Sequence, residues 1–143
     1  MTHTCAVDAN HRAWCWGFGR TGQIGDGNLF NRFTPRTVRD RHPFRRVNAG
    51  DGHTCAETTD GVPYCWGLNN FGQVGLGATS APILRPTKVT GGFHFAQVTA
   101  GGDHSCGRTS DDVARCWGRN SDGQLGDGTT TDRSAPTLVA GPS

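Results

Sequence analysis

The sequence has almost no lysine or glutamate and contains no long apolar segment. Lys88 is the only lysine and Glu57 the only glutamate among 143 residues. No apolar segment approaches the roughly 18 residues that a membrane-spanning helix needs, and no secretory signal follows Met1. We therefore expect a chain without a membrane span, which is either cytosolic or a mature or trimmed piece of a longer protein.

The charge is nearly balanced and the glycine content is high. Fourteen basic residues against twelve acidic ones give a net charge of +2, which does not favour a nucleic-acid partner. The 22 glycines do not recur every third residue as in collagen, and each would cost about 1 kcal/mol inside a helix. Four tryptophans, seven phenylalanines and six cysteines argue against disorder. These features predict a turn-rich, all-β protein.

A unit with fixed internal spacing occurs three times. Each unit contains a His-(Thr/Ser)-Cys segment, a Cys-Trp-Gly segment, a Gly-Gln-x-Gly-x-Gly loop and a Pro-x-x-Val segment. The His-(Thr/Ser)-Cys segments begin at His3, His53 and His104, which are 50 and 51 residues apart. The loops cover residues 22–27, 72–77 and 123–128, and the Pro-x-x-Val segments cover residues 35–38, 86–89 and 136–139. Such a period indicates a repeat architecture.

The second unit predicts four short strands, as in the blade of a β-propeller. Turn residues separate the expected strands, and apolar and polar residues alternate along the last of them. The predicted strands are residues 53–57, 62–66, 86–89 and 95–100, with 44–49 as the earlier counterpart of 95–100. We expect repeats at 1–43, 44–94 and 95–143. The first repeat lacks its first strand.

These motifs together resemble the repeat of the regulator-of-chromosome-condensation family, and the paired cysteines resemble a variant found in many bacterial proteins. The resemblance covers essentially the whole chain. It implies a β-propeller, usually of seven blades, and a range of binding roles rather than one function. This chain holds only three repeats, which cannot close a ring and would leave strand edges exposed. We expect a homo-oligomeric ring, a part of a longer propeller, or an open stack that pairs with a partner.

Each unit carries two cysteines ten residues apart with a turn midway between them. In the first unit the turn centres near Asn10, so the two cysteines face each other across a hairpin, at a separation close to that of a disulfide. We predict three disulfides, Cys5–Cys15, Cys55–Cys65 and Cys106–Cys116. Three such bonds would imply an oxidising, extracytoplasmic compartment.

Two alternatives to disulfides stay open at this point. The cysteines could be reduced and merely buried. A metal could also bind to His3, Cys5 and Cys15, although each blade offers three ligands and a zinc site usually has four. We predict no bound metal and no cofactor.

One aromatic position and one basic segment differ between the repeats, and we expect their residues to bind a partner. Trp14 occupies a position that holds Tyr64 and Arg115 in the other units, and a variable large residue suits an interface. The segment between residues 36 and 46 is strongly basic, whereas the equivalent segment of the second unit holds only Lys88. The basic residues are Arg36, Arg39, Arg41, Arg45 and Arg46. A solvated loop with no partner is the alternative.

No catalytic set emerges from the sequence. The Gly-Gln-x-Gly-x-Gly loops do not precede a helix, as a phosphate-binding loop would. We therefore expect a non-enzymatic protein-binding or scaffold module made of disulfide-linked blades. The alternatives are a self-assembling subunit that forms a ring or fibre, and a carbohydrate-binding propeller that uses aromatic residues such as Trp14 and Tyr64.

Mass spectrometry of the intact, unreduced protein tests the cysteine pairing. Three disulfides lower the mass by six hydrogen atoms relative to the reduced chain, two for each bond. Alkylation before reduction should label no cysteine, and labelling of all six would contradict the prediction.

Overall fold

The computed structural model describes residues 2–141, which form antiparallel strands and no helix. The first sheet has three strands in the order β1-β2-β3. The second has four in the order β4-β5-β6-β7, and the third has four in the order β11-β10-β9-β8. The strands are β1 (His3–Val7), β2 (Ala13–Gly17), β3 (Arg32–Thr37), β4 (Phe44–Ala49), β5 (His53–Thr58), β6 (Pro63–Gly67), β7 (Ile83–Lys88), β8 (Gln97–Ala100), β9 (His104–Arg108), β10 (Ala114–Gly118) and β11 (Arg133–Leu138).

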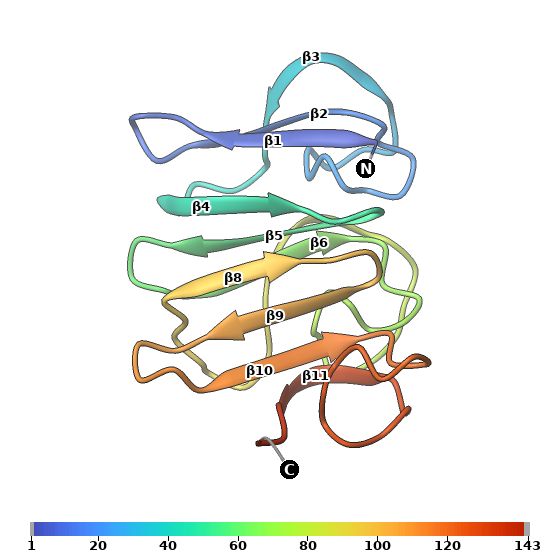
Figure 1. Cartoon of the computed structure of the whole chain (residues 1–143). Helices are drawn as coiled ribbons and strands as arrows, with labels where there is room; N and C mark the ends of the chain where they lie inside the picture. The colour runs from blue at the N-terminus through green and yellow to red at the C-terminus, as the bar shows by residue number, and fades with distance from the viewer. Residues whose placement is uncertain (1, 142–143) are drawn as a thin grey trace.

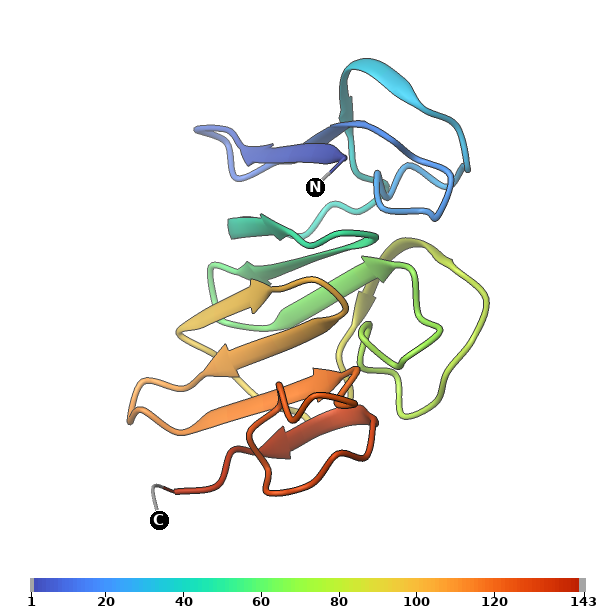
Figure 2. The same ribbon diagram turned by 45° about the vertical axis from the view of Figure 1, so that its right-hand side comes forward.

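The three sheets are stacked in chain order, with the N-terminal sheet at one end and the C-terminal sheet at the other (Figures 1 and 2). Each sheet is one blade, and the stack is not closed into a ring. The all-β blade architecture predicted from the repeat is confirmed. The first sheet lacks the edge strand that β4 and β8 supply to the other two, as the sequence predicted.

A short polar turn connects the two strands of each central hairpin. In the first sheet Asp8 Oδ1 accepts hydrogen bonds from the backbone N–H groups of Asn10 and Arg12, at 2.8 and 3.0 Å. Asp8 is therefore a turn residue that replaces missing backbone partners. The turn places Cys5 opposite Cys15 in the β1–β2 register, and the same register recurs in the other two sheets.

The predicted boundaries of two strands were wrong. We expected residues 86–89 to form a strand that begins at a proline, but β7 begins at Ile83. The β6–β7 register shifts between Cys65 and Gly67, so Pro86 lies in an irregular stretch where its missing N–H is not needed. The strand expected at 95–100 begins at Gln97, because the Phe95 N–H bonds instead to the Gly61 carbonyl, at 2.7 Å.

The apolar core lies between consecutive sheets. Trp66 of the second sheet packs with Ile24 and Phe44, and Trp117 of the third packs with Val74 and Phe95. Both tryptophans are completely buried. Trp16 has the same place in the first sheet but is only half-buried, because no sheet of the described chain precedes it.

Each buried tryptophan lies against a glycine of the preceding sheet's loop. A Cβ added to Gly25 would lie 2.5 Å from Trp66 Nε1, and one added to Gly75 would lie 2.8 Å from Trp117 Nε1. Both glycines also have a positive φ, of 77° and 83°. The loop glycines thus let the next sheet approach closely as well as allowing the turn.

Replacing Gly75 by alanine separates these two roles. Gly75→Ala and Gly77→Ala both place a side chain at positive φ, which costs about 1–2 kcal/mol. Only the Cβ at position 75 would also collide with Trp117, whereas the nearest atom to one at position 77 lies at 3.8 Å. We expect Gly75→Ala to lower the free energy of unfolding by about 1–3 kcal/mol more than Gly77→Ala, as measured by urea unfolding. Equal losses in the two variants would show that the tryptophan contact is unimportant.

Candidate functional site

All six cysteines form disulfides between facing strands of one sheet. The bonds are Cys5–Cys15, Cys55–Cys65 and Cys106–Cys116, each with Cα atoms 4.1 Å apart. The cysteines therefore link strands and are not available as thiolate ligands. Within residues 2–141, no group of three histidine, cysteine or acidic side chains is placed so that it could hold a metal ion.

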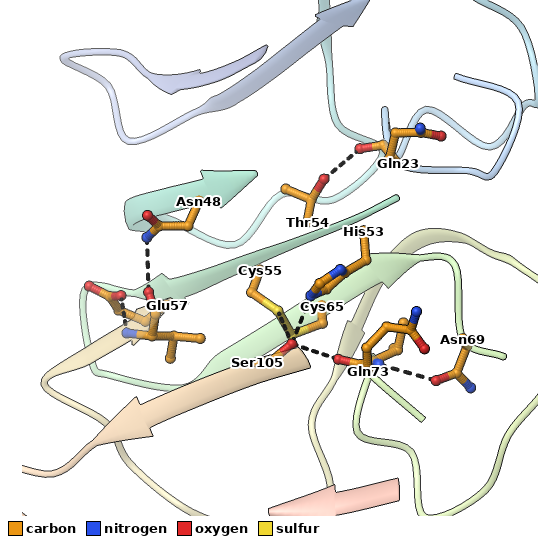
Figure 3. Close-up of a disulfide and its surroundings, with 12 residues drawn as sticks. Gln23, Asn48, His53, Thr54, Cys55, Glu57, Cys65, Asn69, Gln73 and Ser105 are labelled. Carbon is orange, nitrogen blue, oxygen red and sulfur yellow. Dashed lines mark hydrogen bonds between the residues drawn. A yellow bond between two sulfur atoms is a disulfide. The ribbon is translucent and has the colours of Figure 1, made fainter. Parts of the chain in front are cut away.

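A polar contact between consecutive sheets occurs at both junctions of the stack. At the second junction, between the second and third sheets, His53 Nε2 lies 2.9 Å from Ser105 Oγ. The Ser105 hydroxyl donates to the backbone carbonyl of Gln73 at 2.7 Å (Figure 3). Since the hydroxyl proton is directed to that carbonyl, His53 Nε2 must carry the proton of the neutral ring. His53 Nδ1 is then an acceptor, and it is buried without a partner.

The first junction has the same arrangement. Between the first and second sheets, His3 Nε2 lies 2.8 Å from Thr54 Oγ1, and the Thr54 hydroxyl donates to the backbone carbonyl of Gln23 at 2.7 Å. Trp66 Nε1 donates to the same carbonyl at 3.0 Å. Burial lowers the pKa of His3 from 6.5 to about 4 and that of His53 to about 3, so both rings are neutral in the folded protein at neutral pH.

Glu57 is a buried carboxylate that joins the second sheet to the third. Its Oε1 accepts the Val98 N–H at 3.0 Å, and its Oε2 accepts from Arg45 Nε at 2.9 Å and Arg46 Nε at 3.1 Å. Arg45 also donates to the Ala96 carbonyl of the third sheet at 2.8 Å. These contacts satisfy a charge that would be costly to bury alone.

The five predicted arginines do not form one surface. Arg45 and Arg46 are on β4 and are held by Glu57, whereas Arg36, Arg39 and Arg41 are exposed along the edge of a hollow of about 470 Å³. Arg12 lines the same hollow and was not among the predicted residues. We call Arg12, Arg36, Arg39 and Arg41 the arginine groove.

The arginine groove continues into a second hollow of about 520 Å³, which shares Arg12, Asp40 and Arg41 with the first. The two carboxylates at the groove have other partners. Asp26 accepts from Arg32 Nε at 2.6 Å, and Asp40 bonds to the ring of His42. Within the described chain, no carboxylate forms an ion pair with the four arginines of the groove.

The two predicted aromatic residues have different surroundings. The strand register places Trp14, Tyr64 and Arg115 at equivalent positions. Trp14 is half-buried and donates from Nε1 to Asp8 Oδ2 at 2.9 Å. Tyr64 is only 9% exposed, packs edge-on against Phe44 and bonds through its hydroxyl to His42 Nε2 at 3.1 Å. Trp14 is therefore accessible beside the groove and Tyr64 is a core residue.

Residues 2–141 contain no helix that is long and apolar enough to cross a membrane.

The repeat is recognised by a family model described as the regulator of chromosome condensation (RCC1) repeat, which matches residues 10–56, 60–107 and 116–143. A second model with the same description matches residues 44–73 and 95–124. These matches cover most of the chain and confirm the resemblance found in the sequence.

Relatives that are similar in sequence include a plant photoreceptor and a human ubiquitin ligase. The chain is 32% identical over 142 residues to the ultraviolet-B receptor UVR8 of Arabidopsis thaliana. This match covers 96% of the chain and 32% of the receptor. The chain is 31% identical over 139 residues to the E3 ubiquitin-protein ligase HERC2 of Homo sapiens, which covers 95% of this chain and 3% of the ligase. The chain thus spans about a third or less of these relatives.

Yeast RCC1 (Prp20), solved bound to Kap60, is similar in structure. It has a TM-score of 0.84 at 25% identity, and the match covers 98% of this chain and 35% of that one. The similarity extends over all three sheets, so the stacked blades correspond to part of a propeller.

The buried histidines predict that stability falls as the pH is lowered. Below pH 6.5 the unfolded chain binds protons that the folded His3 and His53 do not, so the free energy of unfolding should fall by up to about 1.4 kcal/mol per pH unit for each histidine. Urea unfolding between about pH 5 and pH 7 measures this slope. His53→Gln should reduce the slope, and His94→Gln, at an exposed position, should not. An unchanged slope in His53→Gln would contradict the prediction.

Proposed function

We propose that this chain, which belongs to the regulator of chromosome condensation (RCC1) repeat family, is a non-enzymatic protein-binding module. The family's propeller is typically a protein-interaction module, and yeast RCC1 (Prp20) was solved bound to Kap60. The observation that carries the proposal is the arginine groove, in which four exposed guanidinium groups line two joined hollows and form no ion pair with a carboxylate of residues 2–141.

The arginine groove is not needed for the repeat to fold. Position 12 is valine in the other two units, at residues 62 and 113, and position 36 is threonine, at residues 87 and 137. Position 39 is occupied by Thr90 and Ala140. Because the other blades have the same strands without these arginines, their presence in the first blade supports a role in binding.

The chemistry of the groove favours an acidic protein segment as the partner. A guanidinium group binds a carboxylate through two parallel hydrogen bonds. Two adjoining hollows fit an extended segment with several carboxylates better than a single small anion. Trp14 pairs in register with Thr37, which lines the groove, so its ring can add apolar contact area at the same surface.

The three disulfides are consistent with an extracellular location, and we propose that the module works in an oxidising, extracytoplasmic compartment. A thiol-reducing cytosol would not maintain these bonds. The disulfides also hold β2, which carries Trp14, against β1.

Self-assembly into a ring or fibre stays a prediction from the sequence. The carbohydrate-binding alternative has less support. It relied on Trp14 and Tyr64, but Tyr64 is buried and Trp14 Nε1 is occupied by Asp8.

Binding of a fluorescent polyglutamate peptide tests the proposal. Fluorescence anisotropy should show binding that weakens as salt is raised, and no binding of polyglutamine. Each of Arg36→Gln, Arg39→Gln and Arg41→Gln should weaken binding by up to about fivefold, or about 1 kcal/mol. Arg20→Gln is the matched control, because Arg20 is exposed and lies outside the groove. Equal weakening by Arg20→Gln would overturn the proposed site.

A further inference from the structure

The loop that joins β2 to β3 carries two exposed apolar residues in succession. Leu29 is 46% exposed and Phe30 is 63% exposed. The corresponding loop of the third unit has the same length and holds Thr130 and Thr131 at these two positions. Single exposed apolar residues are common, whereas neighbouring ones form the kind of surface that a partner covers. We call Leu29 and Phe30 the apolar tip.

The apolar tip is exposed because of its place in the blade. The corresponding stretch of the second unit, residues 78–81, is exposed although the second sheet lies between the other two (Figure 1). Phe33 of the first unit differs in this respect, because its counterpart Leu84 lies against Gly22 of the preceding sheet. We therefore leave Phe33 out of the apolar tip.

A glycine that is specific to the first unit holds the backbone of the apolar tip. The other two units have Asn69 and Asn120 at the position of Gly19. A Cβ added to Gly19 would collide with the carbonyl oxygen of Phe30, and the Gly19 N–H donates to Asn31 Oδ1 at 3.0 Å. The loop thus closes onto Gly19, with the backbone of Phe30 packed inward and its ring exposed.

The ring of Phe30 is also held by a fixed guanidinium group. The guanidinium carbon of Arg32 lies 5.6 Å from the centre of the ring, which is a cation–π distance. Arg32 Nε donates to Asp26 Oδ2 at 2.6 Å, and the equivalent pair of the third unit, Arg133 and Asp127, is joined at 2.9 Å. An apolar group that is held in place before binding loses less conformational entropy when a partner covers it.

The apolar tip adjoins one end of the arginine groove. Asn28 directly precedes the tip and Arg32 follows it closely, and both line the first hollow together with Asp26. The second hollow is lined by residues 10–12 and 40–43 and by none of these three. A segment bound along the groove therefore reaches the apolar tip from the first hollow.

We propose that the apolar tip binds a large apolar side chain of the same acidic segment that occupies the arginine groove. This inference rests on the proposed function and specifies its partner as a run of carboxylates next to an aromatic or large aliphatic residue. The guanidinium groups of the groove are complementary to any acidic run, so they give little selectivity by themselves. The apolar tip adds a contact that a purely acidic segment cannot make.

Two extended forms of the fluorescent polyglutamate peptide test this proposal. One carries Phe-Phe and the other Ser-Ser, placed at either end of the glutamate run in turn. Fluorescence anisotropy should show that the wild type binds a Phe-Phe peptide about two- to tenfold more tightly than its Ser-Ser counterpart, which is the range that a pair of aromatic side chains provides.

A double variant with matched residues shows whether the apolar tip is responsible. Leu29→Thr combined with Phe30→Thr gives the tip the residues of the third unit, so the loop should keep its conformation. This variant should bind the Phe-Phe and Ser-Ser peptides equally. Phe33→Thr is the control, because Phe33 is 92% exposed in the same blade but does not line the groove. It should keep the preference for the Phe-Phe peptide.

The outcomes separate this inference from the function on which it rests. A preference for Phe-Phe that persists in the double variant, or that is lost equally in Phe33→Thr, overturns the apolar tip. Equal binding of the two peptides by the wild type also overturns it and leaves the arginine groove standing. If the wild type binds none of the acidic peptides at low salt, both proposals are wrong. Circular dichroism and the intact mass show that each variant is folded and has its disulfides.

Discussion

The close approach of one sheet to the next is the constraint on which this structure depends. A tryptophan of each later sheet lies against a loop glycine of the earlier one, at a separation that leaves no room for a Cβ. This contact explains why the glycines of the loop recur with the tryptophan in every unit. It also fixes where the neighbouring histidine and hydroxyl meet, because each extends from the strand that pairs with the tryptophan strand of its own sheet.

The polar groups at the junctions determine which face of a sheet can pack against its neighbour, because the rest of the contact is apolar and has no such preference. A buried neutral histidine donates to a hydroxyl, and the hydroxyl donates to a glutamine carbonyl. Each link needs a donor on one side and an acceptor on the other, so a sheet cannot be reversed without leaving buried groups unpaired. The same requirement makes the two surfaces that meet at a junction unlike each other, because one supplies the histidine and the backbone carbonyl of the glutamine and the other supplies the hydroxyl and the tryptophan.

Charge has two separate roles in this chain, although its arginines look alike in the sequence. Arg45 and Arg46 neutralise the buried Glu57 within the second sheet. Glu57 accepts the Val98 N–H of the third sheet, and Arg45 also donates to the Ala96 carbonyl. The arginines of the groove form no ion pair within the described part of the chain, and they are exposed. Glu57 is the only glutamate in the chain, and that rarity was the one signal that could have drawn attention to it.

The sequence by itself determined the repeat, the hairpins and the cysteine pairs. These depend on contacts within one unit, and spacing along the chain reports local geometry well. The tertiary structure decided which arginines are free, that Tyr64 is buried, and where β7 begins relative to Pro86. Those outcomes depend on neighbours that are distant in sequence, such as Glu57 beside Arg45 and His42 beside Tyr64. The repeat pattern shows where each hairpin lies along the chain, but only the stacked sheets show which groups one sheet supplies to the next.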